Sequence, residues 1–140
     1  MDDLLIGKAE SLERCVRQIR LYRDMPSDLP LEKDFLRLDA ISANLQRAAE
    51  LCLDMANHVV RRHKLGAPKE SRESFTLLET AGRIDPETAR KLRGMVGFRN
   101  VLVHEYRTVA MEVFLDVVHH RLDDLLAFSA TLLREEGGRA

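Results

Sequence analysis

The chain has 140 residues, a formal net charge of −1, 45% hydrophobic residues and 32% charged residues. This balance is typical of a globular domain of ordinary size, and it excludes both a largely disordered chain and a polycation. No apolar run approaches the roughly 20 residues that span a bilayer, and no basic segment followed by a long apolar run opens the chain, so we expect a cytoplasmic protein.

Apolar residues recur at spacings of three and four, which predicts helices along most of the chain. The first helix is expected over about residues 2–23 and ends near Pro26, because proline disfavours helix just before it. The second is expected to open at 28–30, with Pro30 in its first turn, and to stop at 66–68. Its apolar stripe comprises Phe35, Leu38, Ile41, Leu45, Ala48, Cys52, Met55 and Val59.

A shorter third helix is expected over about 69–80, and a fourth begins with Asp85 as N-cap and Pro86 as its first residue. The last is expected over about 109–134, and 135–140 are expected to form a flexible tail. The stripe of this last helix comprises Met111, Leu115, Val118, Leu122, Leu125, Ser129 and Leu132. The sequence therefore predicts an all-α antiparallel bundle of about five helices, with 1–134 as a single domain.

No metal or cofactor site is expected. Cys15 and Cys52 lie in apolar helical patterns without the spacing of metal ligands, so we interpret both as small buried side chains in a reducing compartment. His58 and His63 are five residues apart and do not share a helix face. The chain carries neither a phosphate-binding Walker loop nor the glycine, serine and paired aspartates of a nucleotidyltransferase.

The segment 97–106 carries the residues best suited to chemistry. Arg99, His104 and Tyr106 stand at offsets 0, 5 and 7 in a largely apolar run. Arginine is a permanent cation that grips phosphate, and histidine is the side chain best suited to moving a proton near neutral pH. Together they indicate a minimal set for breaking RNA without a metal.

The helical register separates these side chains. At about 100° per residue, Arg99 and Tyr106 share a face, whereas His104 lies about 140° from Arg99. Either the helix ends near His104 and the chain turns, or a second copy of the protein completes the site. Gly94 and Gly97 indicate that another backbone comes close to this helix, either across a symmetric dimer or from the second helix of the same chain.

The pattern Arg-x4-His-x-Tyr after Gly-Phe resembles the HepT-like minimal HEPN family. The resemblance covers nearly the whole chain. It also includes residues 44–48 and Asp54 of the second helix, Pro68, the segment 75–78, and residues 122–125. It implies a HEPN-like bundle that dimerises around the motif helix.

The resemblance further implies the toxin of a toxin–antitoxin system, acting as a homodimeric, metal-independent endoribonuclease without a cofactor. Arg99 and His104 would be catalytic, with Asn100 and Tyr106 supporting them. A cognate minimal nucleotidyltransferase would neutralise the toxin by AMPylation of Tyr106. The alternative within the same family is a non-catalytic HEPN partner or subunit of a nucleotidyltransferase.

In the implied reaction, a ribose 2′-OH attacks the adjacent phosphate and leaves a cyclic phosphate and a free 5′-OH. His104 would serve as general base, general acid or both, and Arg99 would hold the phosphate. Asn100 has two interpretations that the sequence leaves open, which are orienting the phosphate or His104 and making an interhelical hydrogen bond.

Overall fold

The computed structural model describes residues 2–105 and 110–137, apart from the side chains of 103–105. Over these ranges it contains helices and no strand, which confirms the all-α prediction. The elements are α1 (Asp3–Asp24), the 3-10 turn η1 (Leu31–Lys33), α2 (Phe35–Arg62), α3 (Glu73–Thr80), α4 (Pro86–Glu105), α5 (Met111–His120) and α6 (Leu122–Gly137).

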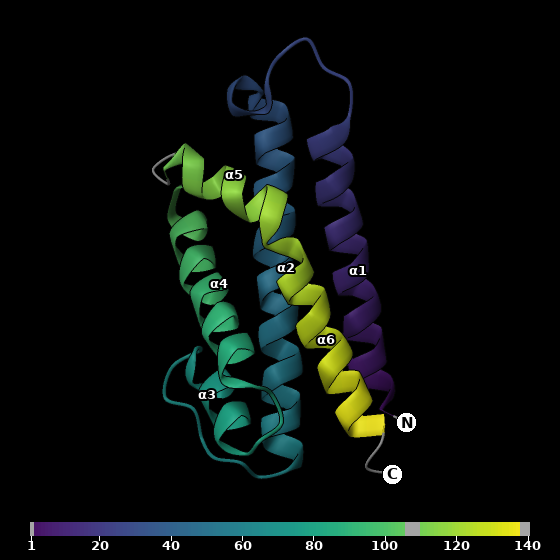
Figure 1. Ribbon diagram of the computed structural model, residues 1–140, viewed down its shortest axis with the longest axis vertical. Helices are drawn as coiled ribbons and strands as arrows, with labels where there is room; N and C mark the ends of the chain where they lie inside the picture. The colour runs from purple at the N-terminus through teal and green to yellow at the C-terminus, as the bar shows by residue number, and fades with distance from the viewer. Residues whose placement is uncertain (1, 106–109, 138–140) are drawn as a thin grey trace.

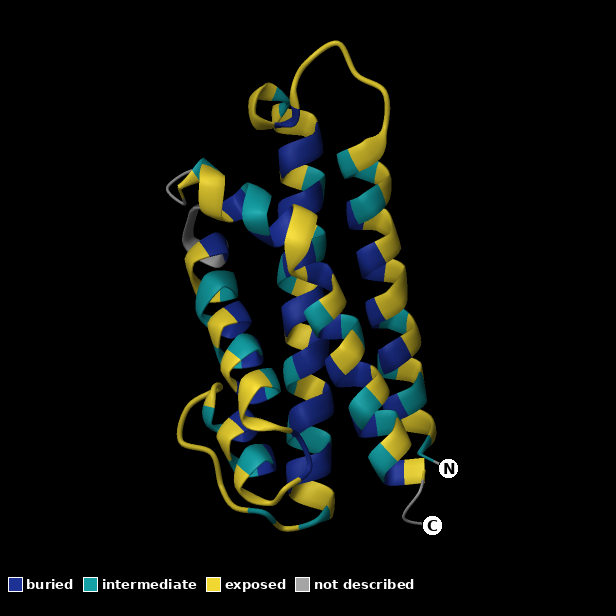
Figure 2. Cartoon of the chain, in the orientation of Figure 1, coloured by how far each residue is buried: buried dark blue, intermediate teal, exposed yellow. Residues whose placement is uncertain are grey.

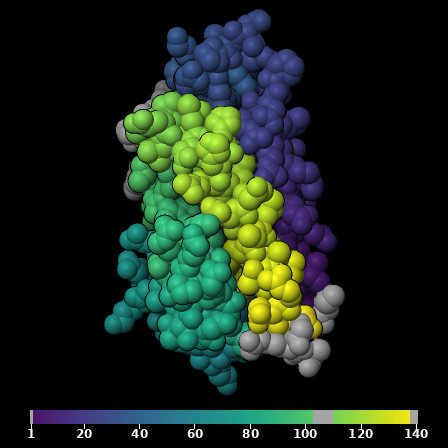
Figure 3. Space-filling view, in the orientation of Figure 1, coloured from purple at the N-terminus to yellow at the C-terminus, as the bar shows by residue number. Residues whose placement is uncertain are grey.

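The long helix α2 is the axis of the bundle, and α1, α3, α4 and α6 all pack against it (Figure 1). α1 and α4 flank α2 on opposite sides. α6 descends in front of α2, between α4 and α1, and closes that side of the core (Figure 3). Buried positions run along the inward faces of these helices and exposed positions along their outer faces (Figure 2).

The apolar stripe of α2 explains its central place. Seven of the eight expected stripe residues, from Leu38 to Val59, are at most 1% exposed. Phe35 is the exception at 56% exposed, so its expected inward position is wrong. Phe35 is the first residue of α2, one turn before the buried Leu38, where the bundle ends.

The start of α2 also differs from the prediction. The helix begins at Phe35 and not near Pro30, because Asp34 is its N-cap and its carboxylate accepts the backbone N–H of Arg37 at 3.3 Å. The segment that was expected to form the first turn is the separate 3-10 turn η1. The Arg37 guanidinium and backbone N–H hold the pKa of Asp34 below its usual value.

Arg37 joins the end of α1 to the start of α2. Its side chain is 7% exposed, and its guanidinium donates to the carbonyls of Tyr22, Arg23 and Leu29 at 3.1, 3.2 and 2.8 Å. Its Nε donates to Asp34 at 2.8 Å. Since partly buried carbonyls without partners are costly, this one side chain fixes the path of the α1–α2 connection.

The expected final helix is two helices. α5 ends at His120 and α6 begins at Leu122, with Arg121 between them as the C-cap of α5, whose N–H donates to the Val117 carbonyl. The bend turns the buried face of α5, so that Phe114 and Val117 are buried while Met111 and Leu115 are only half-buried.

The expected tail 135–140 is helical as far as Gly137, and 138–140 lie outside the described residues. The reason is Glu136, whose carboxylate is 3% exposed and lies 2.8 Å from His63 Nε2 and 3.3 Å from Arg83 Nη1. These contacts tie the last turn of α6 to the end of α2 and to the α3–α4 connection.

Two further expectations concern burial and the membrane. Cys15 and Cys52 are buried as expected, and burial raises the pKa of both thiols, so both stay protonated at neutral pH. Among the helices of the described ranges, none offers an apolar stretch of the length needed to cross a bilayer.

We expect Arg37→Leu to lower the free energy of unfolding by about 2 kcal/mol, because it leaves three carbonyls of the α1–α2 connection without their donor. Urea denaturation monitored by circular dichroism measures this. Arg47→Leu is the matched control, since Arg47 is an exposed arginine on the same helix, and its effect should stay within about 0.5 kcal/mol. Equal losses in the two variants would contradict the role given to Arg37.

Candidate functional site

α4 carries the motif and is positioned by its apolar face. Asp85 caps the helix as expected, accepting the Thr88 N–H at 2.7 Å, and Pro86 is its first residue. The buried residues of α4 face the core, where they pack against α2 and α6; they are Ala89, Leu92, Met95, Val96 and Leu102. This packing places the side of α4 that bears Arg99 next to α2.

Arg99 lies in the contact between α4 and α2. Its Nη2 donates to Glu50 Oε1 of α2 at 2.6 Å, and its Nη1 donates to Asn100 Oδ1 at 3.1 Å. Its Nε is buried and has no hydrogen-bond partner among the described atoms. The side chain is 29% exposed. Glu50 and Asn100 therefore hold the Arg99 guanidinium in place. One edge of it stays open to solvent, and the Nε–H donor is unsatisfied.

Glu50 is the site residue that sequence reasoning missed. It stands 49 residues before Arg99, and its carboxylate is 48% exposed. An exposed glutamate beside a buried helical stripe carries no signal of its own. Only the packing of α4 against α2 shows that this carboxylate meets the motif arginine.

Among the described residues, Asn100 contacts Arg99 of its own helix, and its expected role toward the phosphate or His104 stays a prediction. Its Oδ1 accepts a hydrogen bond from the adjacent Arg99 within α4, and this atom makes no described hydrogen bond to another helix. The residue is exposed. Asn100 therefore orients the guanidinium of Arg99.

The other motif residues are placed only in part. α4 remains helical through Glu105, so the backbone of His104 belongs to the helix, while its side chain lies outside the described residues. Tyr106 also lies outside them. α4 ends at Glu105, one residue after His104, which agrees with the alternative in which the helix ends near His104. The alternative in which a second copy completes the site stays a prediction. One straight helix carries Arg99 and His104 on faces about 140° apart.

Among the described residues, neither glycine of α4 makes room for another helix backbone. No described atom lies within 4 Å of a Cβ built on Gly94, and the only neighbour of one built on Gly97 is Arg72 Nη1, at 3.6 Å. The alternative in which the second helix of the same chain approaches these glycines is thus excluded for the described residues. The intersubunit alternative stays a prediction.

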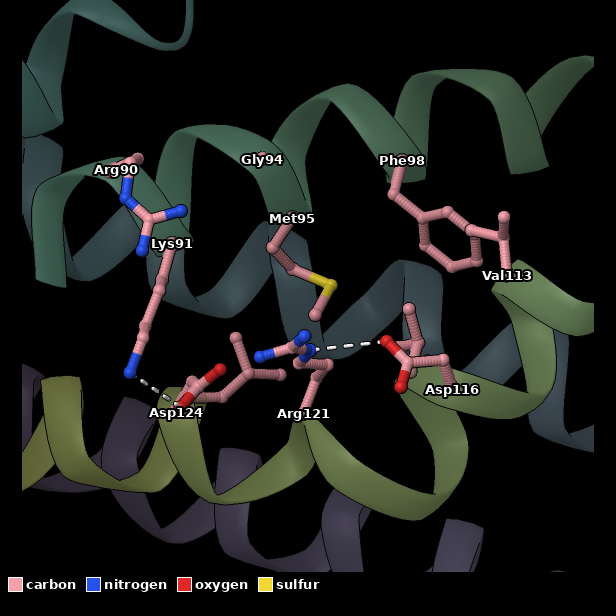
Figure 4. A pocket seen from close by; sticks show the side chains of 11 residues that line it. Arg90, Lys91, Gly94, Met95, Phe98, Val113, Asp116, Arg121 and Asp124 are labelled. Atoms are coloured by element: carbon pink, nitrogen blue, oxygen red, sulfur yellow. Dashed lines mark hydrogen bonds and ion pairs between the residues drawn. The ribbon is translucent and has the colours of Figure 1, made fainter. Parts of the chain in front are cut away.

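A shallow pocket lies beside Gly94, between α4 and the α5–α6 bend (Figure 4). Met95 and Phe98 give it an apolar floor. Lys91 lies 3.5 Å from Asp124 across the opening, and Arg121 lies 3.2 Å from Asp116 on the α5–α6 side (Figure 4). Arg90 also lines the pocket, and its Nη2 lies 3.6 Å from Glu87 of α4. Each cation of the lining thus already has a carboxylate partner.

Metal ligands and histidine pairs give no second site. Within 2–105 and 110–137, no group of three or more potential ligands could hold a metal ion. His58 lies 2.6 Å from Asp2, the N-cap of α1, and His63 lies 2.8 Å from Glu136. Both histidines thus fasten the ends of the described chain to α2.

The comparisons with known proteins cover nearly the whole chain. A family model described as Ribonuclease HepT-like matches residues 12–132. The chain is 38% identical over 129 residues to the mRNA nuclease HepT of Shewanella oneidensis, and the match spans 91% of this chain and 95% of that protein.

Solved structures give the same result. The tri-AMPylated Shewanella oneidensis HEPN toxin in complex with MNT antitoxin is 36% identical with a TM-score of 0.87, over 94% of this chain and 98% of that chain. A toxin–antitoxin crystal structure with AMP-PNP is 35% identical with a TM-score of 0.88, over the same shares. The cytosolic protein YutE of Bacillus subtilis, 16% identical with a TM-score of 0.73 over 93% of this chain and 90% of its own, shares the fold alone.

We expect Glu50→Gln to change the free energy of unfolding by less than about 1 kcal/mol, because the ion pair with Arg99 is half exposed and screened by water. Arg99→Gln should behave likewise, and the coupling energy of the double variant should also stay below about 1 kcal/mol. Urea denaturation at constant ionic strength measures all three. A loss of 2 kcal/mol or more would make the pair a structural contact.

Proposed function

The chain belongs to the Ribonuclease HepT-like family, and we propose that it is the toxin of a toxin–antitoxin pair, an endoribonuclease that cuts RNA in the cytoplasm without a metal. The proposal is supported by the mRNA nuclease and the HEPN toxin structures to which the chain is similar. The observation that carries it is Arg99, held by Glu50 and Asn100 on the same helix as His104.

Arg99 is suited to bind the phosphate that is cut. A guanidinium presents paired donors to phosphate oxygens and keeps its charge at every physiological pH. Asn100 and Glu50 fix its orientation before the substrate arrives, so little reorganisation is needed as charge builds on the phosphate. In the resting protein, Glu50 occupies the Nη2 of Arg99, so a phosphate either displaces this carboxylate or binds at the open edge.

His104 supplies the proton transfers. As general base it takes the proton of the ribose 2′-OH, whose oxygen then forms a bond to phosphorus. The bond from phosphorus to the 5′-oxygen breaks, and a general acid protonates that leaving oxygen. The products are a 2′,3′-cyclic phosphate and a 5′-OH, and no metal or oxidant enters the balance.

We propose that a homodimer completes the site. α4 stays helical through Glu105, so one copy presents Arg99 and His104 on different faces. A symmetric pair of α4 helices would bring Arg99 of one copy toward His104 of the other and would supply two imidazoles, one as acid and one as base. Gly94 has open space where such a neighbour would lie.

The partner that we propose is a nucleotidyltransferase antitoxin that attaches AMP to Tyr106. Tyr106 follows Arg99 by seven residues in the sequence and comes directly after the end of α4. A phosphate attached there would compete for the Arg99 guanidinium and repel RNA. The similarity to an AMPylated HEPN toxin in complex with its antitoxin supports this regulation.

Purified protein should cut a single-stranded RNA in the presence of EDTA and leave 5′-OH ends. His104→Ala should lower the rate by about 10²- to 10⁴-fold and Arg99→Ala by about 10²-fold, because each removes transition-state stabilisation. The readout is electrophoresis of end-labelled RNA. Arg47→Ala is the control arginine and should keep the wild-type rate.

Equal rates in wild type and both motif variants, or cleavage that depends fully on added divalent metal, would contradict the nuclease proposal. A wild type that fails to cut RNA and still binds the nucleotidyltransferase would favour the non-catalytic alternative.

Gly94→Ala tests the dimer. In the monomer it should raise the free energy of unfolding by about 1 kcal/mol, since alanine is the better helix former and its Cβ meets no described atom. It should nevertheless weaken self-association in sedimentation equilibrium. Gly7→Ala in α1, which also has open space, should stabilise the fold equally and leave association unchanged. Unchanged association in both variants would count against a dimer around α4.

A further inference from the structure

We propose that Arg72 is a second phosphate-binding residue of the RNA site, which holds the substrate strand on α4 beside the phosphate that is cut. Arg72 precedes α3 as its N-cap residue and belongs to neither the motif nor its helix. The inference rests on the proposed function and extends it by naming the substrate's path along the surface.

The first observation is the position of the guanidinium. Arg72 Nη1 lies 3.6 Å from the point that a Cβ on Gly97 would occupy, and it is the only described atom that comes so close to that point. The absence of a side chain at Gly97 leaves the surface of α4 open there. The guanidinium of Arg72 therefore lies against the motif helix, one turn before Asn100.

The second observation is the helical register. Positions 93, 97, 100 and 104 follow one another at spacings of four, three and four, and form one stripe that we call the outer face of α4. Position 104 follows Gly97 by seven residues, which is about 10.5 Å along the axis and about 20° short of two full turns. Arg72 thus lies over the same face that carries His104, two turns away.

The third observation explains why Arg72 reaches this face. α3 packs on the first part of the outer face, where Arg93 Nη1 donates to Thr76 at 3.3 Å and to Glu79 at 3.2 Å. The connection from α2 rises beside α4 before α3 begins (Figure 1). α3 therefore covers the outer face of α4 only as far as its own first residue. Arg72 comes directly before α3 and lies where the open part of this face begins.

The fourth observation is charge. Arg72 is exposed, and no carboxylate of the described residues lies within ion-pair distance of it. The arginines of α4, by contrast, are paired, Arg90 with Glu87, Arg93 with Glu79 and Arg99 with Glu50. Arg72 is thus an unbalanced cation on a surface whose neighbouring cations are neutralised.

Together these observations define a track for a nucleic-acid backbone. Arg72 lies at its beginning, and Asn100 follows with Arg99, which donates to it. By helical register, position 104 comes at the far end. The distance from Gly97 to position 104 is longer than one phosphate contact, so Arg72 would hold a phosphate next to the reacting one. Such a contact positions the strand without reading its bases.

Arg72→Ala and Arg72→Lys test the proposal, with Arg14→Ala as the matched control. Arg14 is also exposed and without an ion pair among the described residues, but it lies on α1, which does not pack on α4. Thermal unfolding of each variant should match wild type, because the side chain of Arg72 makes no hydrogen bond or ion pair to the described residues.

In cleavage assays, Arg72→Ala should raise KM about fivefold and leave kcat within about twofold, because one phosphate contact is lost and the chemistry is not. Fluorescence anisotropy with a labelled 2′-O-methyl RNA, which lacks the attacking hydroxyl, should show the same loss of affinity. The slope of log Kd against log salt concentration should fall by about 0.7. Arg72→Lys should keep the slope, and Arg14→Ala should match wild type throughout.

The proposal is overturned if wild type cuts RNA while Arg72→Ala and Arg14→Ala share its KM and salt slope. It is also overturned if Arg72→Ala lowers kcat at unchanged KM. A wild type that binds the 2′-O-methyl RNA through Arg72 and cuts no RNA would leave this inference standing and remove the nuclease proposal. A wild type that neither binds nor cuts would remove both.

Discussion

The burial of one apolar stripe on α2 is the constraint on which the rest of the molecule depends. Six turns of this helix, from Leu38 to Val59, are withdrawn from water, and burial of apolar surface is the dominant favourable term in folding. Every neighbouring helix that covers the stripe is thereby fixed in direction and height. Burial of this stripe also sets the position of α4 against α2. The contact between Arg99 and Glu50 follows from that position.

Two arginine–carboxylate pairs show how burial separates structure from function in one fold. Arg37 is nearly inaccessible and directs its guanidinium at three carbonyls and Asp34, so it has no capacity left for a ligand. Arg99 is partly exposed and keeps one unsatisfied donor. The same chemical group thus holds two chain segments together in one place and, in the function proposed above, binds a phosphate in the other.

Periodicity predicted the helices well where one stripe faces one core, as in α1 and α2, and the Asp85–Pro86 pair predicted the start of α4. It failed where tertiary contacts decide. No proline or glycine marks the bend at Arg121, and the helical end of α6 follows from Glu136 meeting His63 and Arg83. The motif pointed to Arg99, whereas Glu50 became visible only through the packing of two helices.

The two ends of the described chain lie at the same end of the bundle, and α4 runs away from that end toward α5 (Figure 1). The carboxylates of Asp2 and Glu136 each contact a histidine at the C-terminal end of α2. Anything fused to either terminus, such as an affinity handle, a fluorophore or a linker joining two copies in tandem, would therefore emerge far from the motif and leave that surface clear for a large partner.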